Sequence, residues 1–198
     1  MSVRLYIEGG GEGQYLDTLF REGWRKFFEE AGLSGRMPSV VRGQGREQTF
    51  DLFTTAITKP RPGVLPLLLV DSEAPIEEGH SVWQHLKANG GWERPPGAAE
   101  DQAFLMVQVM ETWFLADREL LKRYFGSSLR ETQLRQWPAL EAVPKPTVLD
   151  ALTKATAGCQ KPYAKGKVSY ELLGQLNPRL VEAACPHARD LLERLKRM

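Results

Sequence analysis

Acidic side chains follow two segments of this sequence that are typical of buried strands. Glu8 ends the apolar and β-branched run 3–7, and Asp71 and Glu73 follow the apolar run 65–70. A carboxylate at the exit of an apolar strand loses hydration unless another group compensates it. Asp71 and Glu73 fall on the same side of an extended chain, and Mg²⁺ or Mn²⁺, which prefer hard oxygen ligands, would relieve the repulsion among these acids. The pattern therefore predicts a divalent-metal site.

A second interpretation of the same acids needs no metal. Glu8, or Glu12 four residues later, would stabilise the N-terminus of the next helix, and Asp71 would cap the loop after its strand. For any single acid the two interpretations are about equally supported. Because the acids follow two different strands, we favour the metal site and include Glu12 as a candidate additional ligand.

The turn after the first strand is rich in glycine, with Gly9, Gly10, Gly11 and Gly13. It does not have the dinucleotide-binding spacing G-x-G-x-x-G, because position 14 is Gln14. It also lacks the Gly-Lys-Ser/Thr sequence of a phosphate-binding loop, and acids on both sides of the turn oppose phosphate binding. The sequence thus argues against both kinds of nucleotide site.

Basic residues near two other glycine turns are candidates to neutralise a phosphate. A phosphodiester transition state carries negative charge, which a lysine beside a metal would stabilise. Lys165 and Lys167 are the candidate catalytic lysines, and a solvated charged loop is the alternative interpretation of their segment. The candidate nucleic-acid contacts are Lys161, Arg42 and Arg46.

The elements that must position these residues alternate between strand and helix over residues 1–126. We expect strands at 3–7, 39–42, 65–70 and 103–110, and helices at 16–31, 46–58, 81–88 and 113–124. This alternation predicts an α/β fold with a mainly parallel four-stranded sheet and helices on both faces. Ligands of such sheets bind beyond the carboxyl ends of the strands. Residues 127–198, which prolines break repeatedly, are predicted to form a helical extension packed on the same domain.

Composition limits the classes of protein to consider. The 198 residues carry a net charge of +1 and are 42% hydrophobic, which is typical of a globular chain without a general basic excess. Two cysteines without a partner pattern fit a reducing compartment, so we expect a cytoplasmic protein. The first residues lead into a strand rather than a signal peptide, and no apolar run is long enough for a membrane span.

The order of the acidic motifs resembles the Toprim domain. In this sequence Glu-Gly-Gly-Gly-Glu follows the first strand and Asp-Ser-Glu follows the third. The resemblance implies Mg²⁺ held by Glu8 and Asp71, with Glu73 replacing the usual second aspartate. The Glu8-to-Glu12 spacing is similar to that of the overcoming-lysogenization-defect nucleases. Likeness to these nucleases also implies that Glu111 is an additional ligand and that Lys165 or Lys167 offsets charge on the phosphate.

More narrowly, the chain resembles an uncharacterised bacterial family, domain of unknown function forty-two seventy-six. The matching segments are RLYIEGG at 4–10, VMETWFLAD at 109–117, KPYAKGKVSYELLG at 161–174 and CPHA at 185–188. Related Toprim proteins accompany an ABC-type or AAA-type ATPase in antiphage systems and act as its nuclease effector. The resemblance therefore implies an ATPase partner and a nucleic-acid substrate.

Two functions of different classes follow from these observations. The leading prediction is a Mg²⁺- or Mn²⁺-dependent phosphodiesterase that acts on DNA or RNA as the effector of an ATPase-linked antiphage system. The rival is a non-catalytic Toprim-like adaptor that docks the ATPase. The net charge of +1 favours the rival slightly, because electrostatic attraction supplies most of the non-specific affinity for nucleic acid. The oligomeric state is left open.

The local sequence predicts where four further residues lie. His80 and His85 lie five apart, which does not place them on one helical face as ligands, so we expect both in loops or on the surface. Asp117 is expected on the surface. Trp92, in a glycine- and proline-rich segment, is the one tryptophan considered for a partner or base contact.

Overall fold

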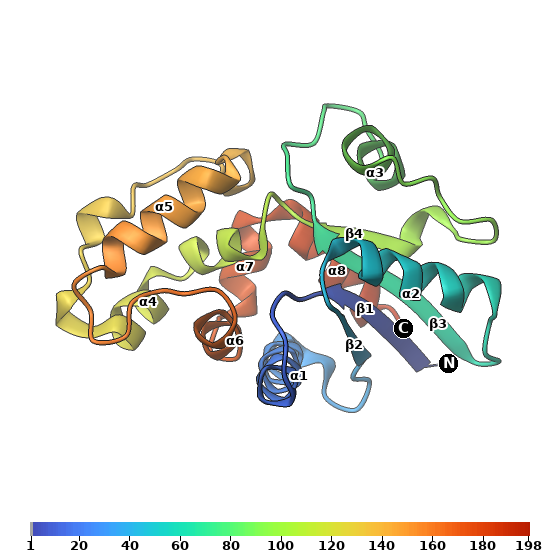
Figure 1. The fold of residues 1–198 in the computed structure, drawn as a ribbon, viewed down its shortest axis with the longest axis horizontal. Coiled ribbons are helices and arrows are strands. Elements are labelled where there is room, and N and C mark those ends of the chain that lie inside the picture. Colours follow the sequence, from blue (N-terminus) through green and yellow to red (C-terminus); the bar gives the residue numbers. More distant parts are fainter. Residues whose placement is uncertain (1) are drawn as a thin grey trace.

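The computed structural model describes residues 2–198 and contains one four-stranded sheet (Figure 1). The strand order is β2-β1-β3-β4, and every neighbouring pair is parallel. The predicted parallel α/β fold is confirmed, because the segments between successive strands are long enough for helical crossovers. The strands are β1 (Ser2–Glu8), β2 (Ser39–Gly43), β3 (Val64–Asp71) and β4 (Ala103–Met106).

Helices cover both faces of the sheet and continue beyond it. Those between strands are α1 (Gln14–Phe28), α2 (Arg46–Thr58) and α3 (Val82–Gly90). After β4 come the 3₁₀ segment η3 (Met110–Ala116), α4 (Arg118–Phe125) and α5 (Lys145–Thr156). The chain continues with α6 (Lys167–Leu173), α7 (Pro178–Ala184) and α8 (Pro186–Lys196).

Side chains of successive strand residues divide between two hydrophobic clusters. Leu5 and Ile7 of β1 join the cluster that includes Trp24 of α1 and Leu191 of α8. Tyr6 between them joins a smaller cluster with α2 and α3. This two-residue period is that of a strand buried on both faces. The late helix α8 therefore completes the larger core on the same face as α1.

The C-terminal helices also lie beyond the carboxyl ends of the strands. Figure 1 shows α4, α5 and α6 to the left of the sheet, on the side where β1 and β3 end. Helix α6 packs closely on α1, since a Cβ at Gly23 would stand 2.6 Å from the Tyr170 carbonyl oxygen. The residues that follow β1 and β3 thus face a junction between the sheet and the helical part.

The segment after β4 departs from the sequence prediction. The expected strand 103–110 ends at Met106, and the single helix expected at 113–124 is divided into η3 and α4. The division occurs at Asp117, whose carboxylate accepts hydrogen bonds from the N–H groups of Leu120 (3.0 Å) and Asn177 (3.0 Å). This cap begins a new helix, and it buries Asp117, so the expectation of a surface residue was wrong.

None of the helices within residues 2–198 is both long and apolar enough to cross a membrane.

The start of α8 is expected to make stability depend on pH. His187 Nδ1 lies 2.7 Å from Glu141 Oε2, and this hydrogen bond raises the pKa of His187. The stabilisation should be complete below the ordinary histidine pKa of about 6.5 and should be lost as the pH rises through the higher value of the folded protein. Thermal unfolding should therefore show a larger loss of Tm for Glu141→Gln at pH 6 than at pH 9. Equal losses at both pH values would contradict this assignment.

Candidate metal centre

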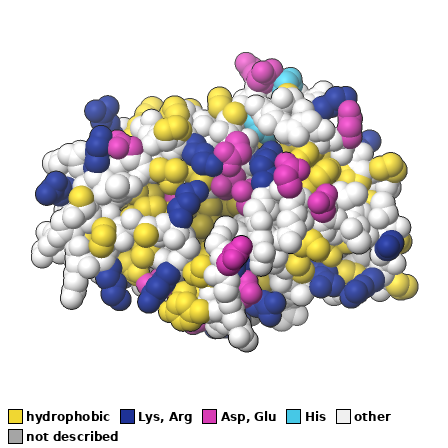
Figure 2. All heavy atoms as spheres, in the orientation of Figure 1, with side chains coloured by type: hydrophobic (Ala, Val, Ile, Leu, Met, Phe, Trp, Pro, Cys, Tyr) yellow, Lys and Arg dark blue, Asp and Glu magenta, His cyan; other side chains and the backbone are white. Residues whose placement is uncertain are grey.

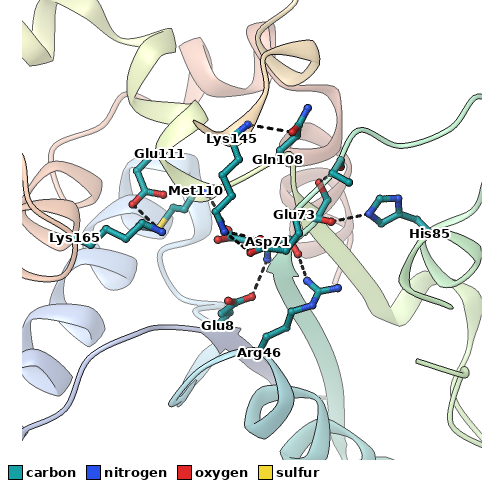
Figure 3. A network of polar contacts seen from close by, with 12 residues as sticks. Glu8, Arg46, Asp71, Glu73, His85, Gln108, Met110, Glu111, Lys145 and Lys165 are labelled. Carbon is teal, nitrogen blue, oxygen red and sulfur yellow. Dashed lines mark hydrogen bonds and ion pairs between the residues drawn. The ribbon is translucent and has the colours of Figure 1, made fainter. Parts of the chain in front are cut away.

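Three carboxylates meet at the carboxyl edge of the sheet, as Figure 3 shows. Glu8 ends β1, Asp71 ends β3, and Glu73 follows two residues later. Each offers one oxygen, and these three oxygens all lie within 4.8 Å of one another. Because β1 and β3 are parallel neighbours, their last residues must emerge at the same edge. The sequence prediction for these three residues thus agrees with the geometry.

Backbone hydrogen bonds fix two of the carboxylates. Glu8 Oε2 accepts from the N–H of Asp71 at 3.2 Å, and Asp71 Oδ1 accepts from the N–H of Met110 at 2.9 Å. The Asp71 side chain is buried, so these contacts replace part of its lost hydration. Each carboxylate still has a second oxygen and free lone pairs that a cation can use.

Burial and mutual repulsion place the cluster under electrostatic strain. Burial raises the pKa of Asp71 well above its ordinary value, and the charges of Glu8 and Glu111 raise it further, against Lys165 and Lys145. Burial also raises the pKa of Glu8, although the Asp71 N–H and Arg46 oppose the shift. A divalent cation bound by oxygen atoms would offset both effects. The donor set therefore fits a hard cation such as Mg²⁺ or Mn²⁺.

The loop after Asp71 is held by a buried histidine. His85 Nε2 lies 2.8 Å from the Ser72 carbonyl oxygen, which can only accept, so Nε2 carries the hydrogen. The next residue, Glu73, has the left-handed φ of 65° that is uncommon outside glycine. Its N–H donates to the Gln108 carbonyl at 2.9 Å. The prediction that His85 lies in a loop or on the surface was wrong, because it is fully buried in α3.

A lysine that the sequence did not single out completes the cluster. Lys145 Nζ lies 2.6 Å from both carboxylate oxygens of Glu73. Lys145 is the first residue of α5, and its own N–H donates to Gln108 Oε1 at 3.2 Å. The flanking prolines at 144 and 146 indicate a helix start, but nothing in the sequence places that helix beside Glu73.

A second lysine–glutamate ion pair lies on the other side of the centre. Glu111 is 3% exposed, accepts a hydrogen bond from the Tyr163 hydroxyl, and lies 3.8 Å from Lys165 Nζ. The charge of Glu111, after burial, raises the pKa of Tyr163, which therefore stays protonated as the donor. Glu111 and Lys165 line a cleft of about 340 Å³ together with Glu8 and Asp71. Figure 2 shows acidic and basic side chains gathered around a hollow on this face.

Three other predicted residues lie apart from these carboxylates. Glu12 is exposed in the glycine-rich turn and is not one of the three converging acids. Lys167 lies over the Tyr15 ring, 5.7 Å from its centroid, and 3.8 Å from Glu171. Lys161 is exposed in the loop before α6. Of the lysines around Gly166, the structure therefore brings only Lys165 to the cleft.

Arg42, predicted as a nucleic-acid contact, binds the glycine-rich turn instead. Its side chain is 4% exposed and forms an ion pair with Asp17. Its guanidinium also donates to the carbonyls of Gly9, Gly10 and Gly11. A Cβ at Gly9 would stand 3.0 Å from Arg42 Cγ, so glycine permits this close approach. Arg42 thereby holds the segment that follows Glu8.

Arg46, the other predicted arginine contact, supports the strand end of Asp71. Its guanidinium donates to the Asp71 carbonyl and lies 4.4 Å from the centroid of Trp92. Trp92 is buried and stacks on Phe50, with ring centroids 4.3 Å apart. Trp92, the tryptophan considered for a partner or base contact, is therefore part of the core, with the Arg46 guanidinium over its ring. The sequence signal for this pairing is weak, since 46 residues separate the two.

Fold and site together define a parallel α/β protein with an acidic, metal-competent centre at the carboxyl edge of its sheet. The chain belongs to the family described as Domain of unknown function (DUF4276), whose model matches residues 7–196. That span includes the whole centre, from Glu8 to Lys165. No curated protein and no solved structure matched the chain.

Removal of the buried charge of Asp71 should stabilise the metal-free protein and abolish metal binding. The ionised form of Asp71 destabilises the fold, and the effect grows as the pH rises from about 4, the ordinary pKa, through the raised value. Asp71→Asn keeps the oxygen that accepts from Met110. The metal-free variant should therefore have a higher Tm than wild type at pH 8, with a difference that shrinks toward pH 4.

Mn²⁺ should stabilise wild type alone. A ligand at a hundred times its Kd stabilises the folded state by about 2.7 kcal/mol, so Mn²⁺ should raise the Tm of wild type but not of Asp71→Asn. Differential scanning calorimetry with EDTA or Mn²⁺ measures both effects. The same Mn²⁺-induced increase in Tm for both proteins would exclude Asp71 as a ligand.

Proposed function

We propose that this protein is a Mg²⁺- or Mn²⁺-dependent phosphodiesterase that cleaves nucleic acid in the cytoplasm. The observation that carries the proposal is the convergence of Glu8, Asp71 and Glu73 within 4.8 Å, beside a cleft with a lysine on its other wall. Carboxylates at one edge hold a cation, while an amine opposite them binds an anion. A phosphodiester needs both.

The residues of the chain divide the chemistry among them. Glu8, Asp71 and Glu73 would hold the cation, which when bound polarises a phosphoryl oxygen and lowers the pKa of water. Lys165 binds the phosphate from the opposite wall, where its amine offsets the charge that develops as water adds to phosphorus and an ester P–O bond breaks. Glu111 positions Lys165, and the Tyr163 hydroxyl holds Glu111 in turn.

The small net charge supports dependence on a partner. Affinity for nucleic acid that does not depend on sequence comes mainly from contacts with phosphates, and this chain has a net charge of only +1. Of the two arginines considered as phosphate contacts, Arg42 is committed to the glycine-rich turn and Arg46 to the Asp71 carbonyl. We therefore propose that an ABC-type or AAA-type ATPase delivers the substrate, and that the pair acts in antiphage defence.

The phosphodiesterase proposal can be tested without a partner on bis(p-nitrophenyl) phosphate. DNA and RNA oligonucleotides that carry a fluorophore and a quencher test nucleic acid in the same way. Wild type with Mn²⁺ should cleave slowly. Glu8→Gln should reduce kcat by about a hundredfold or more, the usual cost of losing a preorganised charge in an active site. Glu78→Gln, an exposed change in the loop after Glu73, is the matched control and should leave the rate unchanged. Equal rates for Glu8→Gln and wild type would refute the proposal.

A second candidate function, an adaptor that docks the ATPase, is supported by a different surface. A groove of about 840 Å³ runs along β2, which is an edge strand, between α1 and α2. Four arginines and two acids line it, together with apolar residues such as Leu52. An edge strand offers unpaired backbone groups that an added strand can use. Charge complementarity favours an extended acidic segment of the ATPase over a second copy of this chain.

Docking is testable by capture of purified candidate ABC-type and AAA-type ATPases on this chain. Arg21→Glu on the α1 wall and Leu52→Glu on the α2 wall should each weaken capture about tenfold or more, since like charges oppose an acidic segment. Arg123→Glu on α4, also an exposed site, should leave capture unchanged. Capture that survives both groove variants would show that the partner docks elsewhere.

A further inference from the structure

The amine of Lys145 occupies a position that matters for the metal. It donates to both oxygens of Glu73 at 2.6 Å, and the Lys145 side chain is 24% exposed. Glu73 is one of the three converging acids. A cation that takes an oxygen of Glu73 must therefore share that carboxylate with an ammonium group or displace it.

Within residues 2–198, Lys145 is the one cationic side chain that hydrogen-bonds to any of these three carboxylates. Arg46 binds the backbone carbonyl of Asp71 rather than its carboxylate. Lys165 lies closest to Glu111, at 3.8 Å. The Lys145 amine is thus the counter-ion of the metal-free cluster, and Figure 3 shows it extended from α5 toward Glu73 and Asp71.

We propose that Lys145 is a displaceable counter-ion, which a divalent cation replaces at Glu73 and whose freed amine then binds the substrate phosphate. This inference rests on the proposed function and adds a second phosphate-binding lysine to it. No covalent bond of the protein changes in the exchange: the ammonium group gives up its hydrogen bonds to the carboxylate, and the divalent ion is coordinated in its place. The net charge of the cluster becomes more positive, which favours an anionic substrate.

The geometry of Lys145 suits such a movement. Its backbone N–H is anchored to Gln108 Oε1 at 3.2 Å, at the first residue of α5. The amine stands at the end of a flexible four-carbon chain, as a compact charge that can turn while the helix stays in place. Glu73 has its own fixed backbone, through the Gln108 carbonyl. Removing the Lys145 amine therefore frees the carboxylate without releasing the loop.

If the metal displaces Lys145, removal of the Lys145 amine should increase the affinity for the metal. Calorimetric titration with Mn²⁺ alone should show tighter binding by Lys145→Met than by wild type, by about tenfold, a typical coupling between two ligands. A lysine that merely positions Glu73 would instead give weaker binding when removed. Lys154→Met, in the same helix with its own partner Asp150 at 2.8 Å, is the matched control and should bind Mn²⁺ like wild type.

The phosphate half of the proposal has its own measurement. Binding of a fluorescein-labelled ten-nucleotide single strand, followed by anisotropy with Ca²⁺ in place of Mn²⁺, should be about tenfold weaker for Lys145→Met than for wild type. Ca²⁺ should strengthen oligonucleotide binding more in wild type than in the variant, because only wild type releases an amine. Melting curves check that each variant folds. If Lys145→Met does not fold, Lys145→Gln takes its place, because glutamine keeps a hydrogen-bond donor without the charge.

The outcomes separate this inference from the proposed function. Tighter Mn²⁺ binding with weaker oligonucleotide binding supports the exchange. Mn²⁺ binding that is unchanged or weaker in Lys145→Met overturns the exchange and leaves the metal centre intact. If neither wild type nor any variant binds Mn²⁺, the proposed function falls and the role of Lys145 falls with it.

Discussion

Repulsion among carboxylates that a parallel sheet forces together is the constraint on which this structure depends. Two neighbouring strands end in acids at one edge, and burial removes much of the water that would screen Asp71 and Glu8. The surrounding contacts can be understood as responses to that repulsion. N–H groups of Asp71 and Met110 donate to the acids, Arg46 binds the backbone beside them, and Lys145 binds Glu73. None of these groups neutralises all three charges, so the donor set of the centre still fits a divalent cation.

A shell of hydrogen bonds and one cation–π contact keeps these acids in place. Arg42 closes over the glycine-rich turn after Glu8, and His85 holds the loop after Asp71. The Trp92 ring packs against the Arg46 guanidinium. These groups lie behind the cluster and need no contact with a ligand. Such support matters because a metal site works only when its ligands are already in position.

The strand ends could be predicted from sequence because they depend on local pattern and on one topological rule. Apolar runs mark the strands, and parallel neighbours end together, so Glu8 and Asp71 had to meet. Lys145 could not be found in this way, because its place depends on how α5 packs beyond the sheet, 72 residues from Glu73. His85 and Trp92 were misjudged for a related reason. A polar residue, or an aromatic one in a glycine-rich segment, indicates exposure only until tertiary contacts bury it.

The two walls of the cleft come from distant parts of the chain, and this has a consequence for biosynthesis. Glu8 and Asp71 lie at the ends of β1 and β3, whereas Lys165 of the opposite wall belongs to the helical part that begins after α4, as does Lys145 beside Glu73. A ribosome therefore makes the acidic wall well before the basic one, and domains form progressively as the chain emerges. A nascent chain can present the acids of the centre while the segment that carries the lysines does not yet exist. The complete cleft, with acids and lysines facing each other, therefore exists only after the helical part has folded against the sheet, and the proposed phosphodiesterase would be inactive until then.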